Sequence, residues 1–506
     1  MSVIHSMAQG FSVALTPMNL MLAFSGAVVG TLVGVLPGIG PITGVAILVP
    51  LTYAMKLPPE SAIILLAGIY YGAMYGGSTT SILLNVPGET ASVVTTLDGY
   101  QMAKQGRAGS ALAIAAIGSF VAGTLSVVGL MLFGPSLAKW AIRFGPAEYL
   151  ALMVFAFSMI STLAGKNLAK ALIATLLGLA FATVGIDPGS AVPRYTYGQL
   201  KLYDGMDFLV LAIGLFAISE ILVLLEESHT GQTVTAEMGK VWISFKELLF
   251  SMGAIIRGSL LGFFIGVLPG AGASIASFIS YTLEKRVSNR NDTFGKGDIR
   301  GVAGPEAANN AAAGGALIPL LTMGIPGSGT TAILLGALMG MNVTPGPLMF
   351  QNHPKVVWGL VASMYIGNVM LLILNLPLVG LFVKILLVPR WILLPVVTAI
   401  SFIGVYSVNN SPFDLLLMAG FGLLGYLMRK MDYPLAPVIL GLVLGEMMEK
   451  NLRRALSISD GEWSYLFKSP ISITLWILAA VSLITPLIFR KLKTMKDEIV
   501  TGEEEL

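Results

Sequence analysis

The sequence contains no cysteine and few charged residues. None of its 506 residues is cysteine, so a disulfide framework, a thiolate metal site and a cysteine nucleophile are all excluded. Charged residues make up 11% of the chain and hydrophobic residues 55%, and the mean hydropathy is +0.82. A soluble chain of this length needs far more charge to cover its surface. The composition therefore excludes an ordinary soluble protein.

Other scarcities narrow the function. The three histidines, His5, His229 and His353, fall in terminal or loop positions, where a lone histidine is usually solvated. The first 19 residues contain no Lys or Arg, so we expect no cleaved signal peptide. The net charge is only +3 and the basic residues fall in loops, which indicates membrane topology rather than a nucleic-acid partner.

Long apolar runs recur along the chain, and each is long enough to cross a hydrocarbon core about 30 Å thick. The 58 glycines and 26 prolines include many inside these runs, so the helices must be interrupted often. Irregular backbone at membrane depth persists only where protein or a water-filled cavity covers it. We therefore predict an all-α polytopic membrane protein with about 11 or more crossings and with broken or re-entrant helices. The clearest runs are Ala111–Phe133, Phe208–Leu225, Val357–Leu387 and Ile471–Ile488.

Two helix-breaking phrases occur twice, in the same order. "GVLPGIGPITG" at Gly34–Gly44 is matched by "GVLPGAGASIA" at Gly266–Ala276. "YGGSTTSILLNVPGETAS", ending at Ser92, is matched by "AGGALIPLLTMGIPGSGTT", ending at Thr331. The ordered matches predict a duplication, with units at 1–226 and 251–449, a cytoplasmic linker at 227–250, and a terminal membrane helix and cytoplasmic tail at 450–506.

The placement of Lys and Arg predicts that the two units are inverted relative to each other. The final "RKLKTMK" indicates a cytoplasmic C-terminus, and the uncharged start indicates an N-terminus outside the cytoplasm. The basic loops at 97–109 and 284–302 have weakly charged counterparts in the other unit, as an inverted repeat requires. Two loops, with Lys139 and Arg143 in one and Lys450, Arg453 and Arg454 in the other, disagree with this topology.

Inverted repeats place ligand sites near the bilayer midplane, where interrupted helices of the two units meet. Helix starts favour anions, and the carbonyl groups at helix ends favour cations. The alternative for any single glycine is close helix packing. The predicted substrate-binding residues are Gly38, Gly40, Thr43, Ser78, Thr79, Thr80, Pro87, Gly88, Gly270, Gly272, Ser274, Asn309, Asn310, Pro326, Gly327, Ser328 and Thr330. The predicted cation-coupling residues are Asn85, Glu89, Glu306 and Asn310, with sodium as a possible ion and no other cofactor.

A third polar stretch, "GVAGPEAANNAAAGG" at Gly301–Gly315, has two interpretations. In the first, Pro305 opens a helix and Glu306 stabilises its positive end. In the second, the carboxylate and the amides of Asn309 and Asn310 form a ligand or ion site, because polar groups at membrane depth are costly and usually functional. Three other acids, Asp187, Asp204 and Asp207, are expected to be solvated in loops.

On these phrases the sequence resembles the large membrane subunit of the tripartite tricarboxylate transporters, a bacterial family. The resemblance covers nearly the whole chain and includes "GVLPGIGP", "GGSTTSILLNVPGE" and "GIPGSGTTAILLGAL". It implies a bacterial inner-membrane permease that works with a small membrane subunit and an extracytoplasmic solute-binding protein. It also implies import of a tri- or dicarboxylate by symport with Na⁺ or H⁺, without ATP, and the chain lacks a P-loop.

Two other classes of protein compete with this expectation. An ion channel would also use broken helices and carbonyl-lined sites. An intramembrane enzyme would need a base beside the serine of "PGSGTT", and the apolar runs offer neither His nor Lys there. We therefore expect a transporter and no enzymatic activity.

Overall fold

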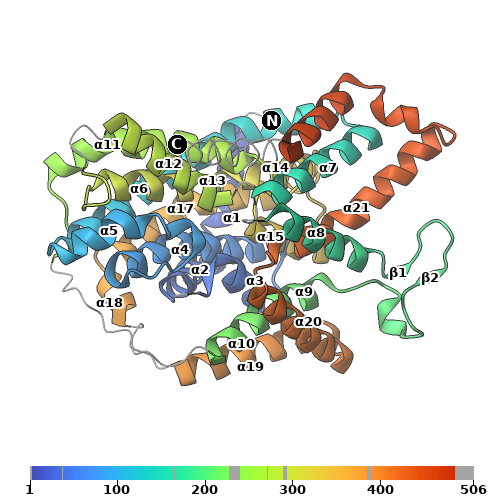
Figure 1. Cartoon of the computed structure of the whole chain (residues 1–506), viewed down its shortest axis with the longest axis horizontal. Coiled ribbons are helices and arrows are strands. Elements are labelled where there is room, and N and C mark those ends of the chain that lie inside the picture. The colour runs from blue at the N-terminus through green and yellow to red at the C-terminus, as the bar shows by residue number, and fades with distance from the viewer. Residues whose placement is uncertain are drawn as a thin grey trace, which may run out of the picture.

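The computed structural model describes residues 3–36, 38–163, 167–226, 240–270, 272–288, 293–384 and 390–484. Helices dominate this part of the chain (Figure 1). The described strands, β1 (Gly185–Ile186) and β2 (Pro193–Arg194), form one short antiparallel pair at an edge of the helical body. Within these described ranges, six helices are long and apolar enough to cross a membrane, and several shorter apolar helices accompany them. The chain is thus an all-α multi-pass membrane protein, while the count of about 11 crossings stays a prediction.

Most helices follow one another with short connections, while a longer segment that contains β1 and β2 joins α8 to α9. In the first expected unit they are α1 (Val3–Ala14), α2 (Pro17–Val35), α3 (Gly40–Ala54), α4 (Pro59–Leu84), η1 (Thr90–Ser92), α5 (Thr95–Lys104), α6 (Ala108–Ala141), α7 (Pro146–Leu163), α8 (Leu168–Ala182), η2 (Leu200–Leu202), α9 (Phe208–Ala212), the π-helical η3 (Ile213–Ile218) and α10 (Ser219–Glu226).

The second expected unit is also a series of helices. Its helices are α11 (Phe245–Val267), α12 (Gly272–Ser288), α13 (Arg300–Gly315), α14 (Leu317–Met323), α15 (Gly329–Gly340), α16 (Met349–Asn352), α17 (Pro354–Asn375), α18 (Val379–Val383), α19 (Arg390–Asn409), α20 (Pro412–Lys430) and α21 (Ala436–Ile458), followed by η5 (Trp463–Phe467) and an apolar helix at Pro470–Ile484. Helix α21 continues across the expected boundary at 449/450. The basic tail after 484 lies outside the described residues.

Glycines bring α2 and α4 into backbone contact. Gly26, Gly30 and Gly34 of α2 are four residues apart, and a Cβ on any of them would lie within 2.5 Å of a carbonyl oxygen of α4. Such small-residue seams are typical of helices packed inside membranes. Along this seam, later residues of α2 contact later residues of α4, so the two helices run parallel. The chain between them, which includes α3, must therefore lead back to the starting end of α2. The contacts join Gly26 to Leu65, Gly30 to Ile69 and Gly34 to Ala73.

The second unit contains the same seam between α11 and α13. Its glycines are again four residues apart, and they again face carbonyl oxygens of a parallel helix, with Cβ positions 2.2–2.4 Å from oxygen. Two separate stretches of sequence thus produce the same helix pair, as a duplication predicts. The contacts join Gly258 to Gly304, Gly262 to Ala308 and Gly266 to Ala312.

The two units exchange contacts through their last helices. Helix α8 of the first unit packs against α21 of the second, where a Cβ at Gly178 would lie 2.1 Å from the Val438 oxygen. In the reciprocal contact, α20 packs against α9, η3 and α10, with Gly214 facing the Met418 oxygen. The units are therefore interlocked, and neither buries its last helix alone.

Candidate functional site

At the first helix break of each unit, two glycines adopt the left-handed backbone conformation. In the first unit Gly38 and Gly40 have φ values of +89° and +54°, and in the second Gly270 and Gly272 have +79° and +64°. This left-handed region is open to glycine and costly for other L-residues. Both glycines of each G-x-G phrase therefore take a backbone conformation that favours glycine, which explains why the sequence has glycine at these four positions.

The second break of each unit also repeats its geometry residue by residue. Asn85 and Gly324 end α4 and α14 in the left-handed conformation. After the Pro-Gly pair, Glu89 and Ser328 take matching extended conformations, with φ/ψ of −145°/168° and −153°/169°. Each then caps the following helix by reciprocal hydrogen bonds with the residue three positions on.

The glycine of each Pro-Gly pair contacts the backbone of the last glycine in the helix seam of its own unit. A Cβ at Gly88 would lie 2.2 Å from the Gly34 oxygen, and one at Gly327 would lie 2.9 Å from the Gly266 oxygen. Both breaks of a unit are therefore locked together by backbone contact. In the second unit the Gly270 amide also donates to the Gly327 carbonyl, at 3.0 Å.

The breaks of the two units meet each other. The Thr90 hydroxyl lies 2.8 Å from the Ser274 hydroxyl, which joins the second break of unit one to the first break of unit two. The repeat-related contact joins Gly329 to Ile42, where a Cβ on the glycine would lie 2.7 Å from Cδ1. Thr90 is exposed and Ser274 half-buried, so this junction is accessible.

A buried acid and two amides lie on the neighbouring face of α13. Glu306 accepts hydrogen bonds from the Thr95 hydroxyl of α5 and, at 3.2 Å, from the amide of Asn309. Asn310 donates to the Ser119 hydroxyl of α6 at 2.8 Å, and its own Oδ1 has no partner in the described part of the chain. The network therefore connects α13 of unit two with helices of unit one.

Glu89 is the second buried acid. Its side chain is 8% exposed, it interacts electrostatically with Glu306, and its Oε1 has no partner among the described residues. Within those residues neither carboxylate forms an ion pair with Lys or Arg. Because burying an unpaired carboxylate is costly, this pair suits a bound cation or a proton.

Several predicted residues do not present their side chains to the junction. The hydroxyls of Ser78 and Thr80 donate to carbonyls of their own helix. Thr43, Thr79 and Thr330 are buried inside helices, and Pro87 and Pro326 shape the breaks. Asn85 is exposed at the end of α4, where its left-handed backbone accounts for its presence.

An ion pair that the sequence analysis overlooked lies at the first break. Glu220 of α10 is 5% exposed and pairs with Arg429 of α20. A Cβ at Gly38 would lie 2.8 Å from Glu220 Oε1, so the carboxylate touches the break. An acid inside the apolar run Phe208–Leu225 was the available signal, because ionisable residues inside membrane spans are usually functional.

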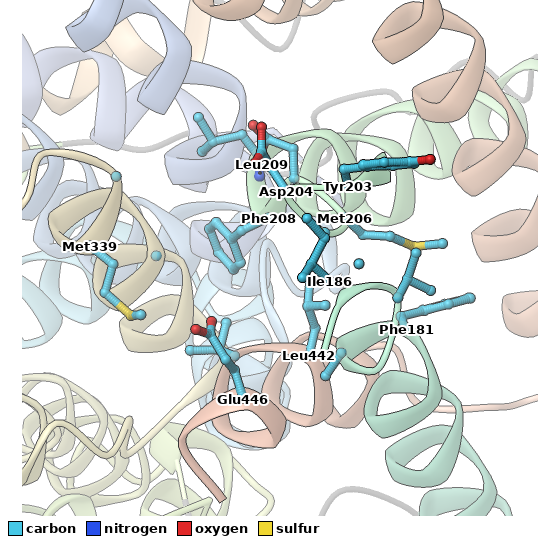
Figure 2. Close-up of a pocket in the computed structure, with 18 of the residues that line it drawn as sticks. Phe181, Ile186, Tyr203, Asp204, Met206, Phe208, Leu209, Met339, Leu442 and Glu446 are labelled. Carbon is cyan, nitrogen blue, oxygen red and sulfur yellow. Dashed lines mark hydrogen bonds between the residues drawn. The ribbon is translucent and has the colours of Figure 1, made fainter. Parts of the chain in front are cut away.

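A cavity of about 450 Å³ lies at the far ends of α3 and α15 (Figure 2). Tyr53 of α3 and Met339 of α15 line it, together with Phe208 and Glu446. Both helices begin at breaks, Gly40 and Ser328, and end at this cavity. The two helices therefore link the junction of breaks to a separate open space.

Comparison with known proteins identifies the chain. Residues 20–440 match the model of the tripartite tricarboxylate transporter TctA family. The chain belongs to the TctA family. It is 43% identical over 504 residues to an uncharacterized 52.8 kDa protein in the TAR-I ttuC′ 3′ region of Agrobacterium vitis, with both chains fully covered. A protein in the TAR-II ttuC′ 3′ region is 44% identical over 243 residues, which are 48% of this chain and all of that one. No solved structure matches significantly.

Membership in the TctA family confirms the resemblance read from the sequence and makes the chain a transporter component. The family name also implies partner subunits, since it describes a tripartite system. The expected binding to a small membrane subunit and a solute-binding protein stays a prediction.

Three local expectations for this TctA-family chain were wrong. Pro305 does not open a helix: α13 begins at Arg300, so Glu306 lies well inside it and cannot be a helix-start acid. Asp187 is not simply solvated, because it is buried between β1 and α21 and pairs with Arg194 at 3.1 Å and Arg453 at 2.6 Å. Asp207 likewise caps α9 by accepting from the Leu209 amide.

Proposed function

We propose that the chain is the permease subunit of a binding-protein-dependent secondary transporter that imports a tri- or dicarboxylate by cation symport. The observation that supports this most is the junction of four matched breaks, two from each unit. Thr90 and Ser274 join the units there, and Glu89 and Ser328 begin helices beside it. Paired interrupted helices at a repeat interface are the arrangement in which secondary transporters bind substrate and coupling ions.

At the breaks themselves, the carboxylate is held by a helix start and by hydroxyl groups. Ser328 begins α15 beside the junction, and the positive end of that helix dipole favours anions. The hydroxyls of Thr90, Ser274 and Ser328 add hydrogen-bond donors. The Tyr70 hydroxyl lies 3.4 Å from the Ser328 hydroxyl. Gly38 is exposed and Gly40, Gly270 and Gly272 are half-buried, so a ligand can approach the backbone closely at these glycines.

The coupling cation binds near the buried acids. Glu89 and Glu306 supply two carboxylates without ion-pair partners, and Asn310 supplies an amide oxygen without a hydrogen-bond partner, in the described part of the chain. Oxygen ligands of this kind suit sodium, and either carboxylate would also hold a proton. In this proposal an incoming cation neutralises the acids before, or together with, the anionic substrate.

The charge arithmetic sets a lower limit on the number of cations. One elementary charge moved against the membrane potential costs about 2.3 kcal/mol per 100 mV. A tricarboxylate entering a negative cytoplasm alone would therefore face a free-energy cost of roughly 7 kcal/mol at a potential of about 100 mV. We propose at least two cations for each dicarboxylate, or three for each tricarboxylate.

The two units are related in this proposal by a two-fold axis in the membrane plane, with the N-terminus periplasmic and the C-terminus cytoplasmic. The matched seams of α2–α4 and α11–α13 and the reciprocal contacts of α8–α21 and α20–α10 support the repeat. The placement of Lys and Arg supports the inversion.

Accumulation in proteoliposomes that contain the complete tripartite system tests the proposal. Labelled citrate, malate and succinate are offered in turn, with an imposed sodium or proton gradient. A symporter concentrates one of them and stops when the gradient is dissipated, whereas a channel only equilibrates it. Asn310→Ala is expected to abolish accumulation while inserting normally. Accumulation without any cation gradient, or normal uptake by the Asn310 variant, would count against this mechanism.

A further inference from the structure

The Glu220–Arg429 ion pair borders the first break of unit one. Arg429 Nη1 pairs with Glu220 Oε2, and Arg429 Nε donates to the Ser219 hydroxyl at 3.1 Å. The other carboxylate oxygen, Oε1, faces Gly38, which is exposed. The carboxylate of Glu220 therefore stands between a guanidinium group and a turn that we assign to the substrate site.

Arg429 has donors left for a ligand. Its Nη2 has no hydrogen-bond partner among the described residues, and its side chain is 29% exposed. A guanidinium presents parallel N–H groups that match a carboxylate in two-point contact. The glycines of α20 and η3 bring the two backbones into contact, and the ion pair with Glu220 and the hydrogen bond to Ser219 orient the guanidinium.

The first unit differs here from the second by one inserted residue. "GLFAISE" from Gly214 to Glu220 corresponds to "GLVLGE" from Gly441 to Glu446, and the π-helix η3 accommodates the extra residue. Such wide turns inside α-helices are frequent at functional sites. In the second unit, α21 is a regular helix and Glu446 pairs with Lys450 of the same helix. In the part of the chain that the structure describes, an acid–arginine pair at a break is thus found in the first unit.

We propose that Arg429 is a substrate-binding residue. Before substrate binds, Glu220 pairs with its guanidinium group, and a substrate carboxylate then replaces Glu220 in this ion pair. This inference rests on the proposed function, since it assigns the substrate carboxylate a cationic partner at the same junction. Glu220 acts as an internal competitor: it has the chemistry of the ligand, and it keeps the guanidinium paired while the site holds no anion.

Neutral variants separate this role from a structural one. Glu220→Gln removes the competing charge and leaves Arg429 in place, so the KM for uptake should fall. Arg429→Gln should raise KM by roughly tenfold to a hundredfold, as for the loss of hydrogen bonds to a charged group. The variant that combines both substitutions should have the same raised KM as Arg429→Gln. Arg429→Lys, which keeps the charge without the two-point contact, should give an intermediate KM.

The matched control is Lys430→Gln, which breaks the exposed ion pair with Glu226 one residue along α20. It should leave KM unchanged. Uptake is measured with whichever of labelled citrate, malate and succinate the wild-type system accumulates, and the amount and melting temperature of each variant are recorded. If the ion pair only holds α20 to α10, both single variants lose stability and the double variant recovers wild-type KM, which would overturn the inference.

An unchanged KM for a stably folded Arg429→Gln would overturn it as well. In both cases the wild-type system still accumulates a carboxylate, so the proposed function survives. If the wild-type system accumulates none of the three acids, the proposed function itself fails.

Discussion

Gly88 is the residue at which a single methyl group should damage the junction most. It belongs to the second break of unit one and lies against the backbone of α2 and α4. The Cβ of Gly88→Ala would lie 2.2 Å from the Gly34 oxygen and 2.8 Å from the Gly77 Cα. Both neighbours are backbone atoms in a packed seam, so neither can rotate away.

The size of the effect follows from this overlap. Close carbon–oxygen contacts in proteins are about 3.3 Å, so the backbone must separate by roughly 1 Å. Overpacking of this kind costs about 1–3 kcal/mol, and the rigid neighbours place Gly88→Ala at the upper end. About 3 kcal/mol corresponds to a change of more than a hundredfold in the unfolding equilibrium. Uptake should fall with stability, because the same shift displaces Glu89.

The assay is thermal unfolding of the purified protein in detergent, together with uptake by the complete system. Gly327→Ala is the repeat-related variant and should be milder, because its Cβ would lie 2.8 Å or more from any neighbour. Gly420→Ala is the control: that glycine is exposed on α20 and nothing lies within 4 Å of its Cβ position. A melting temperature of Gly88→Ala equal to that of Gly420→Ala would refute the reasoning.

Two further predictions concern buried polar groups. Glu306→Ala leaves Thr95 and Asn309 without their acceptor, so it should destabilise the protein by about 1–3 kcal/mol and abolish coupling, as thermal unfolding and sodium- or proton-driven uptake would reveal. Hydrogen bonds from the amides of Ser190 and Gly189, aided by Arg453, lower the pKa of Asp187 from 3.8 to about 2. A carboxylate with a lowered pKa stabilises the fold above its ordinary pKa, and this stabilisation is lost as the pH falls toward 2. Asp187→Asn should therefore melt lower than wild type at pH 7, and the difference should shrink below about pH 4; a constant difference would contradict the assignment.

The sequence predicts the breaks better than it predicts their surroundings. Each G-x-G and Pro-Gly phrase is a local signal, because the left-handed turn and the loss of an N–H donor are properties of those residues. The contact between Thr90 and Ser274 depends on how whole helices pack and has no local signal.

The errors have the same origin. Pro305 is a frequent first-turn residue, yet α13 continues through it. Asp187 finds Arg453 across the fold, 266 positions along the chain. Glu220 lies inside an apolar run of the sequence, but only the packing of α10 against α20 brings its partner Arg429 beside it. Tertiary packing decides each of these, and a single sequence does not encode it locally.

The claim that the breaks of both units form the carboxylate site is tested most directly by protection of one thiol. Since the chain has no cysteine, Thr90→Cys creates a unique one at the exposed junction. Its labelling by a membrane-impermeant methanethiosulfonate is followed in membranes that contain the complete system, with Ser464→Cys on η5 as the distant control. The account predicts that the transported carboxylate slows labelling at Thr90→Cys, more strongly with the driving cation, and leaves Ser464→Cys unaffected. Equal labelling of Thr90→Cys with and without saturating carboxylate would contradict it.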